Sequence, residues 1–286
     1  MKKIILKNSV LALTLVILLT ACGSKEKYTI EFKPQKGAEY KQVALIDMKV
    51  KASEMFSANA NMQMDMRYKV TDVQGDLTTM DVYTDYMKVT LASDKMNVTI
   101  DSNTTDTIAT QDNLNPIAKA AVISPLTITS NKFGKIMSIN GINTMVDNIV
   151  KVLPSSDNPM MAQQMAMLKM GLNDHSVNAM VTQIPASYPE QPVAVGEGWV
   201  VDVDGIKIDF KLKSVENDIA TVDFSSNIKD TEYQGVKMNG TIKGTTLIDL
   251  AGVNAATMDM SLKIDGTSNM MNMQIPVNVE MNMSIK

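Results

Sequence analysis

The stretch MNMQIPVNVEMNMSI, residues 271–285, is the clearest single indicator of how this chain folds. Every odd-numbered position from Met271 to Ile285 is apolar, and every even-numbered position is polar or proline. A period of two residues is typical of a β-strand with one dry face and one wet face. Methionine occupies half of the apolar positions, so the strand is expected to present a methionine-lined surface.

The same alternation recurs through most of the chain and predicts a mainly β, β-rich α+β fold. Residues 62–70 and 206–212 each begin a predicted hairpin, with turns at Gln74–Asp76 and Glu216–Asp218. Further strands are expected near residues 39–51, 94–109, 126–140, 236–250 and 255–264. Aromatic residues make up only 5% of the chain, whereas methionine occurs 25 times, so methionine must supply much of the core volume.

Two segments repeat with the same spacing. YKVTDVQGDL (68–77) aligns with FKLKSVENDI (210–219), and MNVTI (96–100) aligns with MNGTI (238–242), both at an offset of 142 positions. Two matches at one offset indicate an internal duplication. We therefore expect two curved antiparallel sheets or open half-barrels of related structure.

Between the two β halves, apolar residues change to helical spacing. Ile142, Met145, Val146, Ile149 and Leu153 form one stripe, and Pro154 follows its end. A second stripe contains Met161, Met165, Leu168 and Leu172, and a third short helix is expected around residues 180–184. These amphipathic helices are expected to cover the methionine-lined face.

The N-terminus has the charge order of a secretory signal. Lys2, Lys3 and Lys7 precede the apolar run Val10–Leu19, which is too short to span a bilayer. The following Leu19-Thr20-Ala21-Cys22 resembles the lipobox of bacterial lipoproteins. This resemblance implies cleavage before Cys22 and attachment of acyl chains such as palmitate to that residue, which would tether the protein to a membrane.

Two further features resemble lipoproteins of Bacteroidota. Ser24-Lys25-Glu26 is similar to their surface-export tag. Cys22 is also followed by Gly23 and not by the aspartate that retains enterobacterial lipoproteins in the inner membrane. The segment from Pro189 to Trp199 has the pattern Pro-x-x-Pro-Val-x-Val-Gly-x-x-Trp of an uncharacterised family of about 300 residues. The resemblance implies an outer-membrane lipoprotein, facing the periplasm or the cell surface, with no known activity.

These features together predict five regions. They are a signal peptide (1–21), a tether (22–36), a first β half (37–140), a helical insertion (141–185) and a second β half (186–286).

Residues that could carry catalysis are scarce. His175 is the only histidine, and Cys22 is the only cysteine and is expected to carry lipid. No nucleophile elbow, phosphate-binding glycine loop or paired-histidine motif is present. The acidic pI near 5.1 argues against nucleic-acid binding. We expect a protein that is not an enzyme and needs no cofactor or metal.

Three functions remain open. The first is a binding or interaction module for another envelope protein, without a small ligand. The second is binding of a lipid or other hydrophobic molecule, because methionine adapts to varied apolar partners. The third is Cu(I) binding, because Met-x-Met pairs on a strand bring soft thioethers about 7 Å apart. If a ligand exists, the candidate wall is Met62, Met64, Met66, Met271, Met273, Met281 and Met283, and the candidate lid is Met161, Met165 and Leu168.

Overall fold

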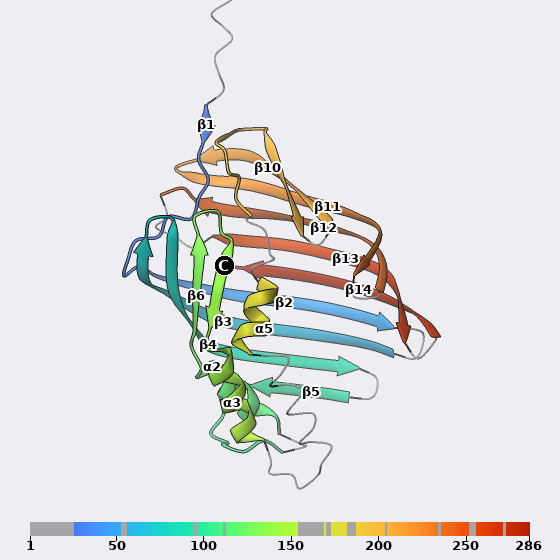
Figure 1. Cartoon of the computed structure of the whole chain (residues 1–286). Helices are drawn as coiled ribbons and strands as arrows, with labels where there is room; N and C mark the ends of the chain where they lie inside the picture. Colours follow the sequence, from blue (N-terminus) through green and yellow to red (C-terminus); the bar gives the residue numbers. More distant parts are fainter. Residues whose placement is uncertain are drawn as a thin grey trace, which may run out of the picture.

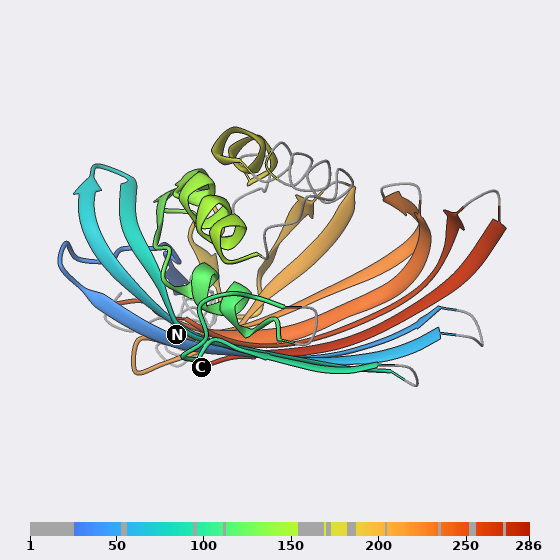
Figure 2. The ribbon, with the colours of Figure 1, turned by 90° about the horizontal axis from the view of Figure 1, so that it is seen from below.

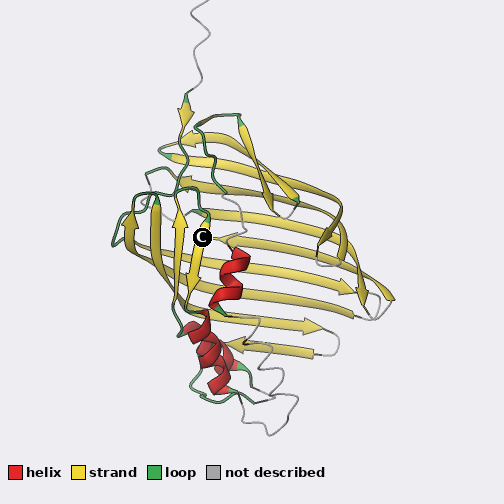
Figure 3. Ribbon diagram, viewed as in Figure 1, coloured by secondary structure: helices red, strands yellow, loops and turns green. Residues whose placement is uncertain are grey.

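The computed structural model describes residues 26–286, with gaps at 53–55, 94–95, 111–112, 154–168, 170–172, 182–186, 204, 234–235, 252–255 and 271–272. Cys22, Met161, Met165, Leu168 and Met271 therefore lie outside the described residues. The fold is mainly β, as expected, and Figures 1 and 3 show a few short helices beside one large sheet.

The strands of the first half are β1 (Lys27–Tyr28), β2 (Glu39–Ala52), β3 (Phe56–Gln74), β4 (Leu77–Ser93), β5 (Met96–Asp101), β6 (Leu126–Asn131) and β7 (Ile136–Asn140). Those of the second half are β8 (Val193–Ala194), β9 (Gly198–Val203), β10 (Ile206–Glu216), β11 (Ile219–Tyr233), β12 (Val236–Asp249), β13 (Thr257–Met270) and β14 (Met273–Ile285). The described helices are α2 (Asn115–Val122), α3 (Ile142–Val152) and α5 (Asp174–Val181).

One antiparallel twelve-stranded sheet contains both halves. Its order is β7-β6-β4-β3-β2-β14-β13-β12-β11-β10-β9, with β5 paired beside β4. The strand predicted from residues 271–285 becomes β14, and it lies in the middle of the sheet between β13 and β2. The two halves therefore join through β14 and β2 into a single open sheet. Figure 2 shows that this sheet is curved and that the helices lie on its concave side.

The alternation places one apolar row across ten strands. In register from β5 to β9, the row reads Ile100, Val89, Met62, Ile46, Met283, Met260, Gly244, Phe224, Phe210 and Trp199. We call the side that carries this row the apolar face and the opposite side the polar face. Gly244 is required in the row, because a Cβ there would lie 2.2 Å from the Phe224 ring.

The predicted repeat is visible in the backbone. Gly37 N–H donates to the Val70 carbonyl (2.9 Å), and Gly196 N–H donates to the Leu212 carbonyl (2.7 Å). Both glycines have positive φ, of 86° and 91°. The ladder also shifts register just after Val70 and just after Leu212, which are themselves 142 positions apart. Each half thus opens with the same turn and bends at the same place.

Three buried clusters hold the sheet to its covering segments. One joins Leu212, Ala220, Val222 and Ile248 to Ile30 and Val193, and a second contains Tyr40, Val70 and Met80. The third joins Ile142 and Val146 of α3 to Ile139 of β7. The cores therefore lie where the N-terminal segment, the β8 segment or a helix crosses the apolar face.

The described part of the predicted tether, residues 26–36, packs against the rest of the fold. There β1 pairs with β8, and Ile30 is 1% exposed within the first cluster. The alternation of Tyr28, Ile30 and Phe32 is the signal for this packing, because period-two apolar residues favour an extended segment with a buried side.

Several predicted boundaries differ from those observed. The strand expected at 94–109 ends at Asp101, and residues 126–140 form a hairpin whose turn contains Gly134 at φ 80°. Residues 115–122, for which no helix was predicted, form α2 with Pro116 in its first turn. Of the helix expected around residues 180–184, Met180 and Val181 form the end of α5, which begins at Asp174, and residues 182–184 lie outside the described residues. Most of the helix expected from 158 to 172 lies outside the described residues.

Candidate functional site

The candidate methionines that the structure describes share the apolar face. Met62 on β3 and Met283 on β14 both pair with Ile46 on β2, so they flank it from either side. Met64 pairs with Ala44, and Met281 pairs with Met48. The structure thus brings together residues more than 200 positions apart, because β2 separates β3 from β14 in the sheet.

These methionines are half-buried rather than core residues. Met62, Met64, Met66, Met281 and Met283 all retain intermediate exposure. Their neighbours on the same face share this state, including Val50, Leu262, Ile264, Val277 and Val279. We call this region, formed by the apolar face of β2, β3, β13 and β14 beyond the buried clusters, the methionine surface. Met273 belongs to β14, opposite Met270, and its side chain lies outside the described part.

A tyrosine-lined cavity lies at one end of the methionine surface. It has a volume of about 230 Å³ and is bordered by Glu31, Phe32, Lys33, Tyr40, Gln42, Tyr68, Met80, Tyr188, Ile248, Asp249 and Ala256. The first half contributes β2, β3 and β4, and the second half contributes the end of β12 and the residue before β13. We call it the tyrosine cavity. Sequence reasoning missed it, because its walls come from four separate parts of the chain.

Hydrogen bonds hold the walls of the tyrosine cavity. Gln42 Nε2 donates to the Ala256 carbonyl at 2.7 Å, and the Tyr188 N–H donates to the Phe133 carbonyl at 3.1 Å. The Tyr68 hydroxyl donates to Met66 Sδ at 3.4 Å, which places the phenol beside the methionine surface. Thioether sulfur is a weak acceptor, so this hydroxyl keeps capacity for a better partner.

The phenols of this cavity are held in their neutral form. Burial raises the pKa of Tyr68 and of Tyr188. Burial also raises the pKa of Tyr40, with a smaller contribution from the charge of Asp249. Removing a phenol from water disfavours its anion. The cavity therefore offers neutral hydroxyl groups rather than charged ones at ordinary pH.

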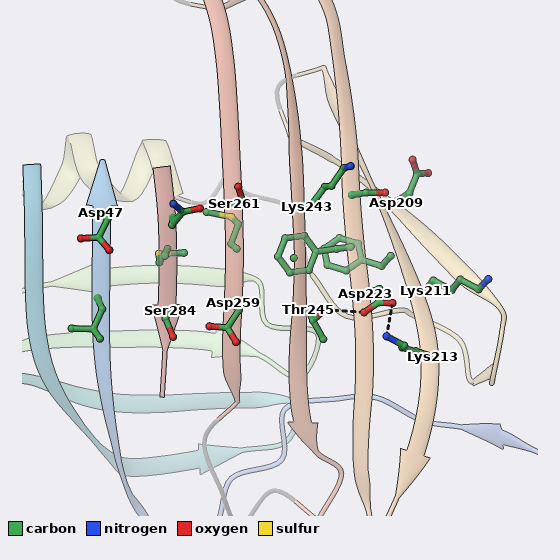
Figure 4. A pocket seen from close by; sticks show the side chains of 18 residues that line it. Asp47, Asp209, Lys211, Lys213, Asp223, Lys243, Thr245, Asp259, Ser261 and Ser284 are labelled. Atoms are coloured by element: carbon green, nitrogen blue, oxygen red, sulfur yellow. Dashed lines mark hydrogen bonds and ion pairs between the residues drawn. The ribbon is translucent and has the colours of Figure 1, made fainter. Parts of the chain in front are cut away.

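A larger hollow lies on the polar face. It has a volume of about 1000 Å³ and crosses β10, β11, β12, β13, β14 and β2 (Figure 4). Asp223 pairs with Lys213 at 3.4 Å and accepts a hydrogen bond from Thr245 at 2.8 Å. Ser284 Oγ is buried without a hydrogen-bond partner in the described chain. The alternation in the sequence predicted only the wet side of a hairpin strand here, formed by Lys207, Asp209, Lys211 and Lys213 of β10.

The described residues contain no group of three or more His, Cys, Asp or Glu side chains that could hold a metal ion. His175 lies exposed in the first turn of α5. Its neighbour Asp174 accepts hydrogen bonds from the backbone N–H groups of Ile142 and Asn143, at 2.8 and 3.3 Å. Asp174 belongs to α5, and it therefore caps the N-terminus of a different helix, α3. This supports a structural role for the segment around His175.

Among the described residues, no helix has both the length and the apolar character needed to cross a membrane.

Comparison with known proteins identifies a family without an assigned activity. No curated protein matches the sequence. A structure reported for lipid–protein interactions in lipovitellin is similar over 88% of this chain, with 9% identity and a TM-score of 0.48, but this chain spans only 25% of that one. OpdQ of Pseudomonas aeruginosa gives 5% identity and a TM-score of 0.19, over 87% of this chain and 98% of that one. Neither likeness is strong enough to support a functional argument. The profile of a family of unknown function, DUF6263, matches residues 75–286, and the protein therefore belongs to that family.

Proposed function

We propose that this protein is a non-catalytic, lipid-anchored envelope protein that binds an acyl-chain ligand on its methionine surface. The observation that carries the proposal is the partial solvent exposure of the apolar side chains on that surface. Apolar side chains of β2, β3, β13 and β14 lie in register on one face and are half-buried, whereas the buried clusters lie elsewhere on the sheet. Contiguous apolar surface of this kind is unusual on a soluble monomer and marks interaction sites.

Methionine suits such a surface because its side chain is unbranched and polarisable. It can adapt to ligands of different shape, whereas branched side chains hold fewer conformations. The concave form of the sheet on this side also increases the contact available to a bound molecule (Figure 2). These properties favour an acyl chain over a rigid ligand.

The anchor and the location belong to the same proposal. The lipobox-like sequence ending at Cys22 supports acylation of that residue, and the resemblance to lipoproteins of Bacteroidota supports the outer membrane as the location. Metabolic labelling with palmitate tests the anchor. The wild-type chain should carry the label, and Cys22→Ser should lose it and leave the membrane fraction. Equal labelling of both would contradict the assignment.

Ligand binding is tested most directly by native mass spectrometry. Full-length protein carrying Cys22→Ser is used, so that attached acyl groups cannot be mistaken for bound ones. We expect a mass increment that matches a lipid recovered in an organic extract of the same sample. A bare mass that stays unchanged after incubation with lipid would overturn the proposal.

A second candidate is the interaction module, and the hollow on the polar face favours it. This hollow carries Asp47, Asp209, Asp223 and Asp259 beside Lys211, Lys213 and Lys243, which suits a polar protein surface rather than an acyl chain. Site-specific crosslinking from Ser225 in intact cells should then give a defined product. Lys211→Glu with Lys243→Glu should abolish it, and a product that persists in this double variant would contradict the role.

A further inference from the structure

We propose that the tyrosine cavity is a headgroup subsite that takes the uncharged, hydroxyl-bearing polar end of the ligand whose acyl chain lies on the methionine surface. This inference rests on the proposed function and adds a ligand class to it. The class is a neutral lipid with free hydroxyl groups, such as an acylglycerol, rather than a fatty acid anion or a lipid with a cationic head.

The cavity and the methionine surface are continuous along two strands. On β3 the apolar face reads Tyr68, Met66, Met64 and Met62 in sequence, and the Tyr68 hydroxyl contacts Met66 Sδ. On β2, Tyr40 and Gln42 line the cavity and lead to Ile46 and Met48 on the same face. A ligand lying along these strands would therefore have one end in the cavity.

The dimensions suit one acyl chain with a small head. From Tyr68 to Met62 the strand rises by about 20 Å, and one leaflet of membrane hydrocarbon is about 15 Å deep. The cavity volume of about 230 Å³ exceeds the roughly 150 Å³ that holds a benzene molecule in an engineered protein cavity. It can therefore hold a glycerol-sized group.

The charges at the cavity argue against an anionic head. Its border carries two carboxylates, Glu31 and Asp249, and one ammonium group, Lys33, so the local charge is negative and repels an anion. Glu31 forms an ion pair with Lys33, and its side chain is only 11% exposed. Asp249 accepts a hydrogen bond from the Ala251 N–H at 2.9 Å, which leaves its charge in place. A quaternary ammonium head neither donates nor accepts hydrogen bonds, so it could satisfy neither the Tyr68 hydroxyl nor the Gln42 carbonyl oxygen.

The uncharged groups that remain suit hydroxyl recognition. The Tyr68 hydroxyl donates to the sulfur of Met66, which is a weak acceptor. A ligand oxygen is a stronger acceptor and would replace this sulfur. The Gln42 side chain donates to Ala256, which fixes its orientation and keeps its own carbonyl oxygen as an acceptor. A hydroxyl group both donates and accepts, so it can satisfy Gln42 and Tyr68 together.

The test compares three probes that share a sixteen-carbon chain: monopalmitoylglycerol, palmitate and hexadecyltrimethylammonium. Binding to full-length protein carrying Cys22→Ser is measured by calorimetry below the concentrations at which the probes form micelles. We expect monopalmitoylglycerol to bind about ten-fold more tightly than the other two. Tyr68→Phe should weaken it by about three- to ten-fold, the range for one lost hydrogen bond, and should leave palmitate unchanged.

A second variant closes the cavity and leaves the methionine surface intact. Ala256→Phe places a ring in the cavity, and it should erase the preference for the glycerol head while all three probes still bind. The control is Tyr86→Phe, which removes a hydroxyl that donates to Asp101 on the polar face and should change nothing.

The outcomes separate the two proposals. If no probe binds the wild-type protein, both the proposed function and the subsite fail. If the probes bind equally well, or if neither Tyr68→Phe nor Ala256→Phe changes their relative affinities, the subsite fails and acyl-chain binding stands.

Discussion

The hairpin β3–β4 and the hairpin β10–β11 share one backbone plan but carry different side chains. Positions 64, 66 and 68 hold Met, Met and Tyr, and the equivalent positions 206, 208 and 210 hold Ile, Ile and Phe. In the second hairpin, Phe210 stacks on Trp199 with ring centroids 5.3 Å apart and lies 5.7 Å from Phe224. Leu212 and Val222 are fully buried there.

The two hairpins therefore differ in how their apolar side chains are packed. Stacked aromatic rings and branched residues fill the second hairpin with side chains of few conformations, and the N-terminal segment covers it through Ile30. The first hairpin is buried at the equivalent positions Val70, Met80 and Val82, but its strand β3 continues into half-buried methionines. The two hairpins thus share a backbone plan, but the second carries stacked aromatic rings and the first carries methionines of the methionine surface.

The largest effect is expected from charges on the methionine surface. Met64→Lys with Met281→Lys should abolish acyl-chain binding, because the chain cannot desolvate two ammonium groups. The matched control is Gln63→Lys with Asn282→Lys, which places the same charges one residue away on the polar face. Measured dissociation constants should be unchanged in the control. Loss of binding in both variants would contradict the assignment to one face.

Leucine at the same two positions separates lipid binding from Cu(I) binding. Met64→Leu with Met281→Leu nearly conserves volume and removes both thioethers. Lipid affinity should stay within about two-fold, and any Cu(I) binding should disappear. Titration with Cu(I) and calorimetry with lipid on the same sample measure both.

Side-chain truncation should distinguish the two hairpins by stability. Leu212 is 0% exposed, so Leu212→Ala should cost about 2–5 kcal/mol of unfolding free energy. Met64→Ala, at a half-buried position, should cost less than about 2 kcal/mol, because less apolar area is lost there. Urea unfolding curves give both values. Similar losses would show that the methionine surface is packed as tightly as the core.

Substitution of the glycine in either repeated turn should lower the unfolding free energy by a smaller amount, equal for the two turns. Gly37 and Gly196 have positive φ, and an added Cβ would meet nothing within 4 Å at either position. Gly37→Ala and Gly196→Ala should therefore each cost only the backbone strain, about 1–2 kcal/mol. The double variant should show the sum of the two, since the turns share no partner. Unequal costs in urea unfolding would argue against equivalent turns.

The smallest expected effect is the pH dependence of stability that arises from the buried tyrosines. Unfolded phenols ionise near pH 10, and burial raises the pKa of Tyr68 above that value. Above about pH 10 the unfolded chain releases these protons first, so the contribution of these tyrosines to stability should be constant below that pH and be lost above it. Tyr68→Phe should flatten the decline in urea midpoints between pH 9 and 11. The equivalent Phe210 has no ionisable group, so Phe210→Leu should leave the slope unchanged.

Local patterns predicted some parts of this fold and not others. The hairpin turns at residues 74–76 and 216–218, strand β2 and helix α3 follow from alternation, helical spacing and turn residues within a few positions. Helix α2 was missed because residues 115–122 carry only a short apolar stripe after Asn115-Pro116. Burial of the segment around Ile30 was missed because an alternation of three residues is too brief to distinguish from a linker.

The sequence by itself determined the local structure and the two-faced character of the strands, because a period of two residues assigns each side chain to a face whatever its neighbours are. It also determined the repeat, which is carried by residues at one constant offset. Only the tertiary structure decided that both halves share one sheet, that Met62 and Met283 flank the same residue of β2, and that the tyrosine cavity forms where four segments meet. These features depend on pairing between strands far apart in the chain, and no local pattern specifies which strand becomes the neighbour of another.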